Sequence, residues 1–294
     1  MTWLEDYRCG DDFQEKSKST RAKMKALEDY TKELQATKKR EEIMKETIDQ
    51  WIETKKIYKN VEVVQLPEPD FPESHSYYSL LLRRQSLRAY SNEPLTLQEI
   101  SYLLWASTGV QRIERRFGMP FGFRTAPSAG GIYPTETYLA VKNVTGLDPG
   151  IYHYNVEKHH LEFIKKGDFH EQLKSACQNQ NWVLHAPVIF LWTAIFRRTT
   201  VNYTQRGYRY VYLDTAHIGA QCAFAALDLK MGSVPIAAFY DDEINAILGA
   251  DGKKESILYL TLVGRPKNWK KYEDRMLKCH DRVEEWRNNP NFQL

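Results

Sequence analysis

The sequence lacks the cysteine patterns that are typical of metal sites and disulfide frameworks. It has no Cys-x-x-Cys pair and no Cys/His ligand spacing, and its four cysteines are scattered, at Cys9, Cys177, Cys222 and Cys279. It also has no marked excess of charge of one sign, because 41 basic residues are balanced by 38 acidic ones. Such a balance gives no basic footprint of the kind that binds nucleic acid. We therefore predict neither a metal site nor a nucleic-acid partner.

Long hydrophobic runs are absent as well. The first ten residues include Glu5, Asp6 and Arg8 but no apolar run, which argues against a signal peptide. The longest apolar run, from Ala186 to Ile195, is too short to span a bilayer. We therefore expect a cytoplasmic protein with no membrane partner, and its 294 residues are ample for a buried core.

The composition changes along the chain and predicts four parts. Residues 12–59 are dense in charge and lack glycine and proline, and their apolar residues recur at helical spacing. Prolines and acidic residues then indicate an extended linker. The predicted parts are a helical N-terminal extension at 1–60, the linker at 61–76, a main domain at 77–267 and a C-terminal helical tail at 268–294. The extension is either a segment that packs on the main domain or a partner subunit, or a separate binding module.

The main domain mixes strand and helix signals without a regular βαβ alternation. A capping box of Thr96 and Glu99 predicts a helix that ends at Gly109. The arginine- and glycine-rich residues 111–125 are predicted to form a loop. Strands are expected over 137–141, 187–195 and 256–263, a hairpin over 150–154 with 161–164, and a long helix over 206–230. This mixture predicts an α+β fold rather than a doubly wound one.

One stretch of the main domain has almost no side-chain bulk. It runs Pro127-Ser128-Ala129-Gly130-Gly131 and is closed by a second proline at position 134. The glycines allow positive φ and the prolines fix φ, so the loop is stiff and its backbone can be approached closely. Such a loop suits a flat ligand that lies against main-chain N–H groups. A simple tight turn before a strand is the alternative.

A second stretch is rich in arginine. Arg83, Arg84 and Arg88 stand with Ser86 within six residues. Guanidinium groups match phosphate oxygens with paired hydrogen bonds, so this segment is a candidate phosphate site. A solvated basic helix face is the alternative.

Five motifs in order resemble the SagB/ThcOx-type dehydrogenases, which are FMN-dependent members of the nitroreductase superfamily. The similarity covers about residues 77–267, and each motif is weak when taken alone. The motifs are Arg83-Arg84-x-Ser86-x-Arg88-x-Tyr90; Pro127-Ser128-Ala129-Gly130-Gly131-x-Tyr133-Pro134-x-Glu136; Gly150-x-Tyr152-His153-Tyr154; Arg206-Gly207-Tyr208-Arg209-Tyr210 with Leu213-Asp214 and His217; and Leu258-Tyr259-x-x-x-Val263-Gly264-Arg265-Pro266.

The resemblance implies a nitroreductase-like fold, with a central mixed sheet flanked by helices, and an intertwined homodimer with FMN at the subunit interface. The implied FMN contacts are of three kinds. The phosphate and ribityl chain would lie near the arginine segment and Arg265, and the isoalloxazine ring would lie against residues 127–131 of the opposite subunit. The other edge of the ring would lie beside Val234, Pro235 and Ile236.

One position departs from the family pattern. Azoline oxidases of this family have a Lys-Tyr pair before the Arg-Gly-Tyr-Arg stretch, and here the pair is Asn202-Tyr203. Asparagine cannot titrate, so Tyr203 is the candidate acid or base, and a plain aromatic wall of the substrate cavity is the alternative. The change weakens the expectation of azoline-to-azole oxidation and leaves the expectation of FMN binding intact.

The resemblance leaves three functional hypotheses. The first is an FMN-dependent oxidoreductase in natural-product biosynthesis that oxidises a peptide or peptide-derived substrate, for example an azoline to an azole, by hydride transfer to flavin N5. The second is an NAD(P)H-dependent reductase of nitro or quinone compounds. The third is a catalytically idle flavoprotein that acts as a scaffold in a modification complex, with residues 1–60 docking a biosynthetic partner protein.

Overall fold

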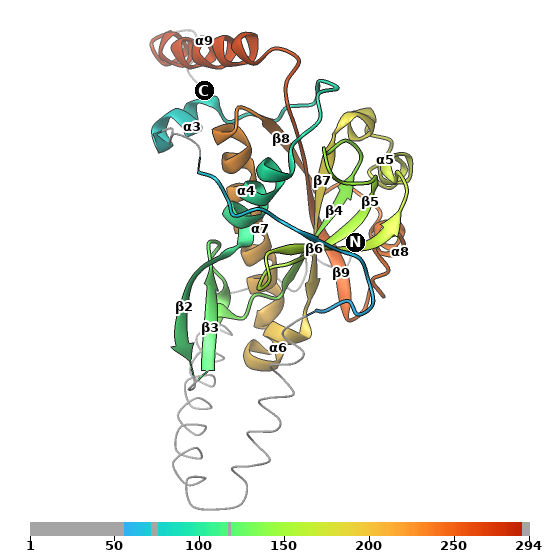
Figure 1. Cartoon of the computed structure of the whole chain (residues 1–294). Helices are drawn as coiled ribbons and strands as arrows, with labels where there is room; N and C mark the ends of the chain where they lie inside the picture. Colours follow the sequence, from blue (N-terminus) through green and yellow to red (C-terminus); the bar gives the residue numbers. More distant parts are fainter. Residues whose placement is uncertain (1–55, 72–75, 117–118, 290–294) are drawn as a thin grey trace, which may run out of the picture. The chain divides into compact units, whose positions relative to one another are not determined.

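A seven-stranded sheet organises residues 56–71, 76–116 and 119–289, which are the residues described by the computed structural model (Figure 1). The strand order is β1-β6-β5-β4-β7-β9-β8. All six ladders between these strands are antiparallel, and a parallel bridge between Ser86 and Ser233 adds one more segment at the β8 edge, so the pairing is mixed as predicted. The strands are β1 (Val63–Gln65), β4 (Thr135–Val141), β5 (Gly150–Asn155), β6 (His160–Lys166), β7 (Val188–Ile195), β8 (Gly232–Ile236) and β9 (Glu255–Gly264).

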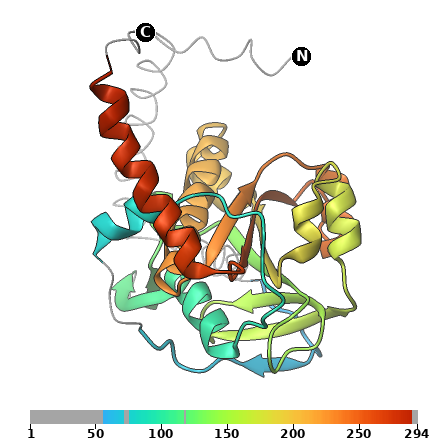
Figure 2. The same ribbon diagram turned by 90° about the horizontal axis from the view of Figure 1, so that it is seen from above.

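Helices cover both faces of the sheet, as the alternation of apolar side chains requires. In β4, Tyr138 and Ala140 pack into one hydrophobic cluster, whereas Leu139 and Val141 pack into the other. One face is covered by α4 (Leu97–Thr108) and α7 (Arg206–Asp228), and the other by α5 (His170–Ala176) and α8 (Asp241–Leu248), as Figures 1 and 2 show. The predicted α+β architecture is confirmed.

Local sequence signals set the ends of several elements. Thr96 caps α4: its side chain accepts a hydrogen bond from the Glu99 backbone N–H, and the Glu99 carboxylate accepts one from the Thr96 backbone N–H, so the predicted capping box is present. The helix ends at Gly109, as predicted. The hairpin expected over 150–154 and 161–164 is formed by β5 and β6.

Two predictions about irregular segments were incomplete or wrong. Residues 111–125, predicted as a loop, form a separate two-stranded sheet of β2 (Val110–Arg116) and β3 (Met119–Arg124). The predicted linker contributes β1, which pairs with β6. Backbone hydrogen bonds to a neighbouring strand make each of these segments a strand, β1 beside β6 and β2 beside β3, although their side chains are largely exposed.

The remaining segments flank the sheet. The short helix α3 (Tyr77–Arg83) precedes the arginine segment, α6 (Arg197–Tyr203) follows β7, and α9 (Trp269–Arg287) forms the predicted C-terminal helix. Residues 1–55, most of the predicted N-terminal extension, lie outside the described residues, and residues 56–60 form no helix. Within the described part of the chain, no helix is both long and apolar enough to cross a membrane.

Candidate functional site

The small-residue loop stands directly before β4. Ala129–Gly131 form the short 3-10 helix η3, in which Gly130 and Gly131 have φ of 62° and 65°. These are the left-handed conformations that glycine adopts without steric cost, as expected from the sequence. The loop therefore presents main chain where another residue type would present a side chain.

The carboxylate of Asp214, on α7, fixes this loop. It accepts hydrogen bonds from Ser128 Oγ at 2.6 Å and from the backbone N–H of Ala129 at 3.1 Å. Ser128 Oγ in turn accepts a hydrogen bond from the backbone N–H of Tyr133 at 2.9 Å. Burial raises the pKa of Asp214, although the hydrogen bonds from Ser128 and Ala129 oppose this effect. One buried carboxylate thus holds both the start of the loop and the chain that follows it.

Tyr203 brings a phenol to the loop. It is the last residue of α6, and a Cβ atom added at Gly130 would lie 2.6 Å from the Tyr203 hydroxyl oxygen. Its ring also packs edge-to-face on Tyr210 of α7, with ring centroids 5.0 Å apart. The neighbouring Asn202 is exposed. Of the two predicted catalytic residues, the structure therefore places Tyr203 against the loop.

The arginine segment begins at Arg83, the last residue of α3, and runs along the β8 edge of the sheet. Ser86 forms the parallel bridge with Ser233, and the backbone N–H of Leu87 donates to Ser233 O at 2.9 Å. Backbone pairing therefore fixes the middle of the segment, between Arg84 and Arg88.

The arginines of this segment have different surroundings. Arg83 Nε donates to Glu273 Oε1 of α9 at 2.7 Å, so its charge is already paired. Arg84 and Arg88 are exposed, and the Arg88 guanidinium carbon lies 5.4 Å from the centre of the Trp182 ring. Two of the three predicted arginines therefore offer an accessible guanidinium group.

The other predicted residues on this side lie in or beside β8 and β9. The side chains of Val234 and Ile236 are buried in the core, whereas Pro235 is exposed, so only Pro235 of these three presents its side chain to the surface. Arg265 Nη2 donates to Glu99 Oε1 at 2.6 Å, and its Nε lies 3.5 Å from a carboxylate oxygen of Glu93. The charge of Arg265 is thus shared by two acidic residues.

The predicted site residues form two groups. The arginine group comprises Arg83, Arg84, Ser86, Arg88, residues 234–236 and Arg265. The loop group comprises Pro127–Gly131 and Tyr203. Both lie along α7, because Asp214 binds the loop and Phe224 packs on Tyr77 of α3, with ring centroids 5.7 Å apart. The step of ten helical residues from Asp214 to Phe224 corresponds to a rise of about 15 Å along α7.

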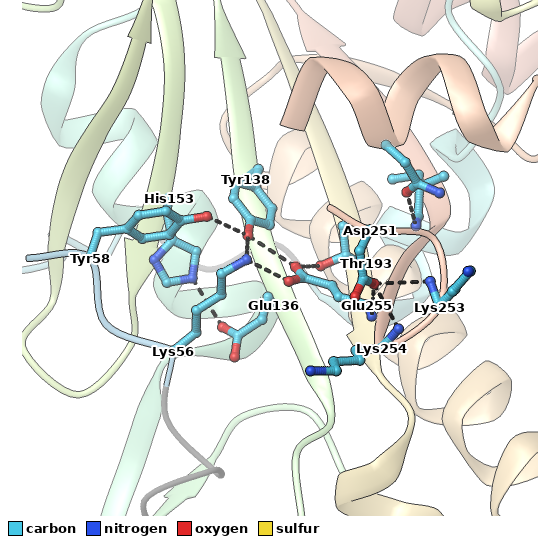
Figure 3. Close-up of polar contacts among 12 residues, drawn as sticks. Lys56, Tyr58, Glu136, Tyr138, His153, Thr193, Asp251, Lys253, Lys254 and Glu255 are labelled. Atoms are coloured by element: carbon cyan, nitrogen blue, oxygen red, sulfur yellow. Dashed lines mark hydrogen bonds and ion pairs between the residues drawn. The ribbon is translucent and has the colours of Figure 1, made fainter. Parts of the chain in front are cut away.

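Two buried polar clusters were not predicted from the sequence. In the first, Glu136 contacts His153 and Arg198, and His153 also contacts Glu162. In the second, Lys56 and Tyr138 contact each other and Glu255, and Thr193 donates to Glu255; Figure 3 shows this cluster beside Glu136 and His153. The available signal was a carboxylate within each of two buried strands, at Glu136 and Glu255. A buried acid needs a partner, but the sequence does not say which one.

The second cluster surrounds Glu255 at the start of β9. Lys56 Nζ lies 2.5 Å from Glu255 Oε2 and 2.5 Å from the Tyr138 hydroxyl, and Thr193 Oγ1 donates to Glu255 Oε1 at 2.6 Å. Burial disfavours the charged amine, but attraction to Glu255 raises the pKa of Lys56 overall. The chain that leads into the main domain is therefore anchored by a buried ion pair.

The residues present fit a cofactor with an anionic tail and a flat ring. On the tail side, Arg84 and Arg88 have no ion-pair partner among the described residues, and Arg265 Nε is a buried donor without a hydrogen-bond partner there. On the ring side, Gly130 and Gly131 present no side chains, and the Tyr203 hydroxyl and the Arg116 guanidinium lie beside them. These are the requirements of FMN, whose phosphate needs cations and whose ring needs a flat contact.

Comparison with known proteins gives one family and several relatives. The model of the nitroreductase family matches residues 81–265. A Methanocaldococcus jannaschii protein named as a nitroreductase is 38% identical over 69% of this chain and 96% of its own length. The trifolitoxin-processing protein TfxB of Rhizobium leguminosarum is 29% identical over 49% of this chain, but only 40% of its own length is covered.

A solved structure supports the same fold. A protein from Anabaena variabilis, described as a nitroreductase, is 25% identical and superposes with a TM-score of 0.60. The match covers 71% of this chain and 42% of the Anabaena chain. The predicted nitroreductase-like fold is therefore confirmed.

Proposed function

The chain belongs to the nitroreductase family, and on that premise we propose that it is an FMN-dependent oxidoreductase that acts on a peptide or a peptide-derived natural product. The observation that carries the proposal is the Tyr203 hydroxyl, which lies against the bare backbone of Gly130. Similarity to a trifolitoxin-processing protein supports a substrate of the natural-product type, such as an azoline that is oxidised to an azole.

Each end of the proposed FMN site has its own residues. Arg84, Arg88 and the hydroxyl of Ser86 would hold the phosphate, since exposed guanidinium groups can each form two hydrogen bonds to it. Arg265 and Arg83 would add positive potential, partly offset by their acidic partners. The loop from Pro127 to Gly131 would lie against the ring. Bound FMN would supply the hydride acceptor at flavin N5.

Tyr203 would handle the proton that accompanies the hydride. Oxidation of an azoline removes a hydride and a proton, and the proton needs a group that can accept or relay it. Among the described residues, two titratable side chains have an oxygen near the loop; the Asp214 carboxylate is already engaged by Ser128 and Ala129, which leaves the Tyr203 hydroxyl for this role. Asn202 cannot take this role, and we assign it only to the rim of the site.

A homodimer would bring the two groups of site residues together. Along the exposed side of α7, Tyr208, Tyr212 and Leu213 are between 50% and 55% exposed, which is a large apolar exposure for one helix. A second copy packed on this side of α7 would bring its loop group toward the arginine group of the first. In such a dimer, each site would combine the arginine group of one subunit with the loop group of the other. This arrangement agrees with the separation of the two groups along α7 within one chain.

Replacing Arg88 with glutamine is expected to weaken FMN binding by about 10- to 10²-fold, because a charge-assisted hydrogen bond to the phosphate contributes roughly 1.5–3 kcal/mol. Riboflavin lacks the phosphate, so its affinity should not change. Quenching of flavin fluorescence during titration of the full chain measures both affinities, and sedimentation velocity of the same samples reports whether the chain is dimeric.

The control for this titration is Arg112→Gln. Arg112 is an exposed arginine on β2 whose partner is Glu114, and it belongs to neither group of site residues. Its replacement should leave both affinities as they are. Equal weakening of FMN and riboflavin binding by Arg88→Gln would contradict a phosphate role, and a monomer that binds no FMN would contradict the proposed site as a whole.

Replacing Tyr203 with phenylalanine is expected to lower turnover of a synthetic thiazoline peptide by about 10²-fold or more, the usual range for general acid–base groups. The assay follows loss of two hydrogen atoms by mass spectrometry, with a dye as electron acceptor. FMN affinity should be retained, because the hydroxyl is not assigned to cofactor binding. Unchanged turnover in this variant would remove Tyr203 as the proton carrier.

An NAD(P)H-dependent nitro or quinone reductase is the second candidate, favoured by the name of the Methanocaldococcus relative. It predicts rapid NAD(P)H oxidation with a nitroaromatic acceptor and no conversion of the thiazoline peptide. A flavoprotein scaffold predicts FMN binding without either activity. The same set of assays therefore separates the three hypotheses.

A further inference from the structure

The carboxylate of Glu136 is the centre of a buried ionic cluster at the start of β4. Its Oε1 lies 2.5 Å from Arg198 Nη1, and its Oε2 lies 3.0 Å from His153 Nε2 (Figure 3 shows the contact with His153). The Glu136 and Arg198 side chains are 8% and 2% exposed, so water does not screen this pair. Although burial raises the pKa of Glu136, Arg198 and His153 bring it down to about 2.

His153 links this pair to a second carboxylate. Its Nδ1 lies 2.7 Å from Glu162 Oε2, while its Nε2 faces Glu136. Ionised carboxylates only accept hydrogen bonds, so both ring nitrogens must carry protons. Burial favours the neutral ring, but the hydrogen bonds to Glu136 and Glu162 raise the pKa of His153 overall. The imidazolium therefore restrains one oxygen of the Glu136 carboxylate, and Arg198 restrains the other.

Glu136 is connected to both parts of the loop group. Along the chain, it follows Gly130 by six residues through the stiff segment that ends in Pro134. Through its ion pair it holds Arg198, which lies in the first turn of α6. Tyr203 is five residues further along this helix, a rise of about 7.5 Å. The short helix α6 has no side-chain cap at its N-terminus, so it depends on tertiary contacts, and this ion pair restrains it together with the packing of Tyr203 on Tyr210 of α7.

We propose that Glu136 is a positioning residue for the candidate site: its ion pair with Arg198, restrained by His153, fixes α6 so that the Tyr203 hydroxyl stays against Gly130. The inference deepens the proposed function and rests on it where it concerns turnover. It assigns the buried cluster a role beyond stability, namely to keep α6 in a fixed position relative to the loop that precedes β4. Glu136 itself touches no substrate in this scheme.

Hydrogen exchange of the full chain tests the positioning directly, without a substrate. In Glu136→Gln, the backbone amides of α6 should exchange at least about tenfold faster, because a helix this short depends on its tertiary contacts. Glu255→Gln is the matched control, since it neutralises a neighbouring buried acid that contacts Lys56, Tyr138 and Thr193 rather than α6. Equal exchange of α6 in the two variants would overturn the proposal.

A double-mutant cycle tests whether the effect acts through Tyr203. Glu136→Gln alone should lower kcat for the thiazoline peptide by roughly 10- to 10²-fold with little change in KM, as expected for a misplaced reacting group. In the Tyr203→Phe background, it should cause no further loss. Effects that multiply in the double variant would overturn the proposal.

Two further measurements keep these outcomes separate from other failures. If Glu136→Gln does not fold, Arg198→Lys replaces it, because lysine keeps the charge but loses the planar fork, and the same changes in exchange and kcat are expected at smaller size. If wild-type protein does not convert the peptide, the proposed function fails, while the exchange experiment still decides the positioning role. Flavin absorbance of each variant confirms that the cofactor is bound.

Discussion

Replacing Gly130 with alanine is expected to lower turnover of the thiazoline peptide by about 10²-fold while the protein remains folded. Residue 130 has φ of 62°, and a Cβ atom there would lie 2.6 Å from the Tyr203 hydroxyl oxygen. The left-handed backbone costs alanine only about 1–2 kcal/mol, but the tyrosine must move away. A displacement of about 1 Å at a reacting group can cost about 10²-fold in rate. Steady-state turnover and the midpoint of thermal unfolding measure the two effects separately.

The matched control is Gly249→Ala at the C-terminus of α8. Gly249 has φ of 73°, and a Cβ atom added there has no neighbour within 4 Å. The two variants therefore share the backbone cost, but only the first displaces Tyr203. Gly249→Ala should lower the unfolding midpoint to a similar extent and leave turnover unchanged. Equal losses of turnover in the two variants would show that backbone strain, and not the tyrosine contact, limits the reaction.

The elements that could be predicted from the sequence are those whose signals are local. The capping box of Thr96 and Glu99 lies within one helical turn, and the apolar run over 187–195 marks a strand buried on both faces. The glycines at 130 and 131 indicated a left-handed turn because glycine has no Cβ atom. In each case the residues that carry the signal are also those that form the structure.

The missed elements depend on partners that are distant in sequence or on pairing with little burial. β1 is a strand because Val63 and Val64 pair with β6, although nearby prolines indicate an extended linker. The β2–β3 hairpin is rich in arginine and largely exposed, so no apolar alternation indicates it. Backbone hydrogen bonds define such strands, and the pattern of their side chains therefore gives little indication that a strand forms.

The site itself could be predicted only in part for the same reason. The small residues at 127–131 indicated the loop, the family resemblance indicated Tyr203, and the Tyr203 hydroxyl lies against Gly130 in the structure. The roles of Asp214 and Glu136 became visible only through their partners, Ser128 and Arg198, which lie on other elements. A carboxylate in a buried strand indicates that some cation is near, but only the folded chain identifies it.

Replacing Lys56 with methionine is expected to lower the free energy of unfolding by about 2 kcal/mol. Removing one partner of a fully buried ion pair costs roughly 3–5 kcal/mol, and the expected loss is smaller here because the Lys56 side chain is 21% exposed. Glu255 would keep only the hydroxyl donors of Tyr138 and Thr193. Because the pKa of Lys56 is raised above its ordinary value near 10.5, its contribution is fully present below that value and is lost as the pH rises through the raised pKa.

Urea denaturation of two further variants identifies the cause of this loss. In Lys56→Met/Glu255→Gln, the stranded charge is removed as well, so part of the loss, about 1 kcal/mol or more, should be recovered. Lys166→Met is the surface control, because Lys166 pairs with Asp148 at 2.8 Å while the two side chains are 76% and 62% exposed. It should cost clearly less than Lys56→Met, since water and salt screen exposed pairs. If the double variant is less stable than Lys56→Met, the loss does not come from an uncompensated buried carboxylate, and Lys56 acts mainly through the packing of its side chain over Tyr58 and Tyr138.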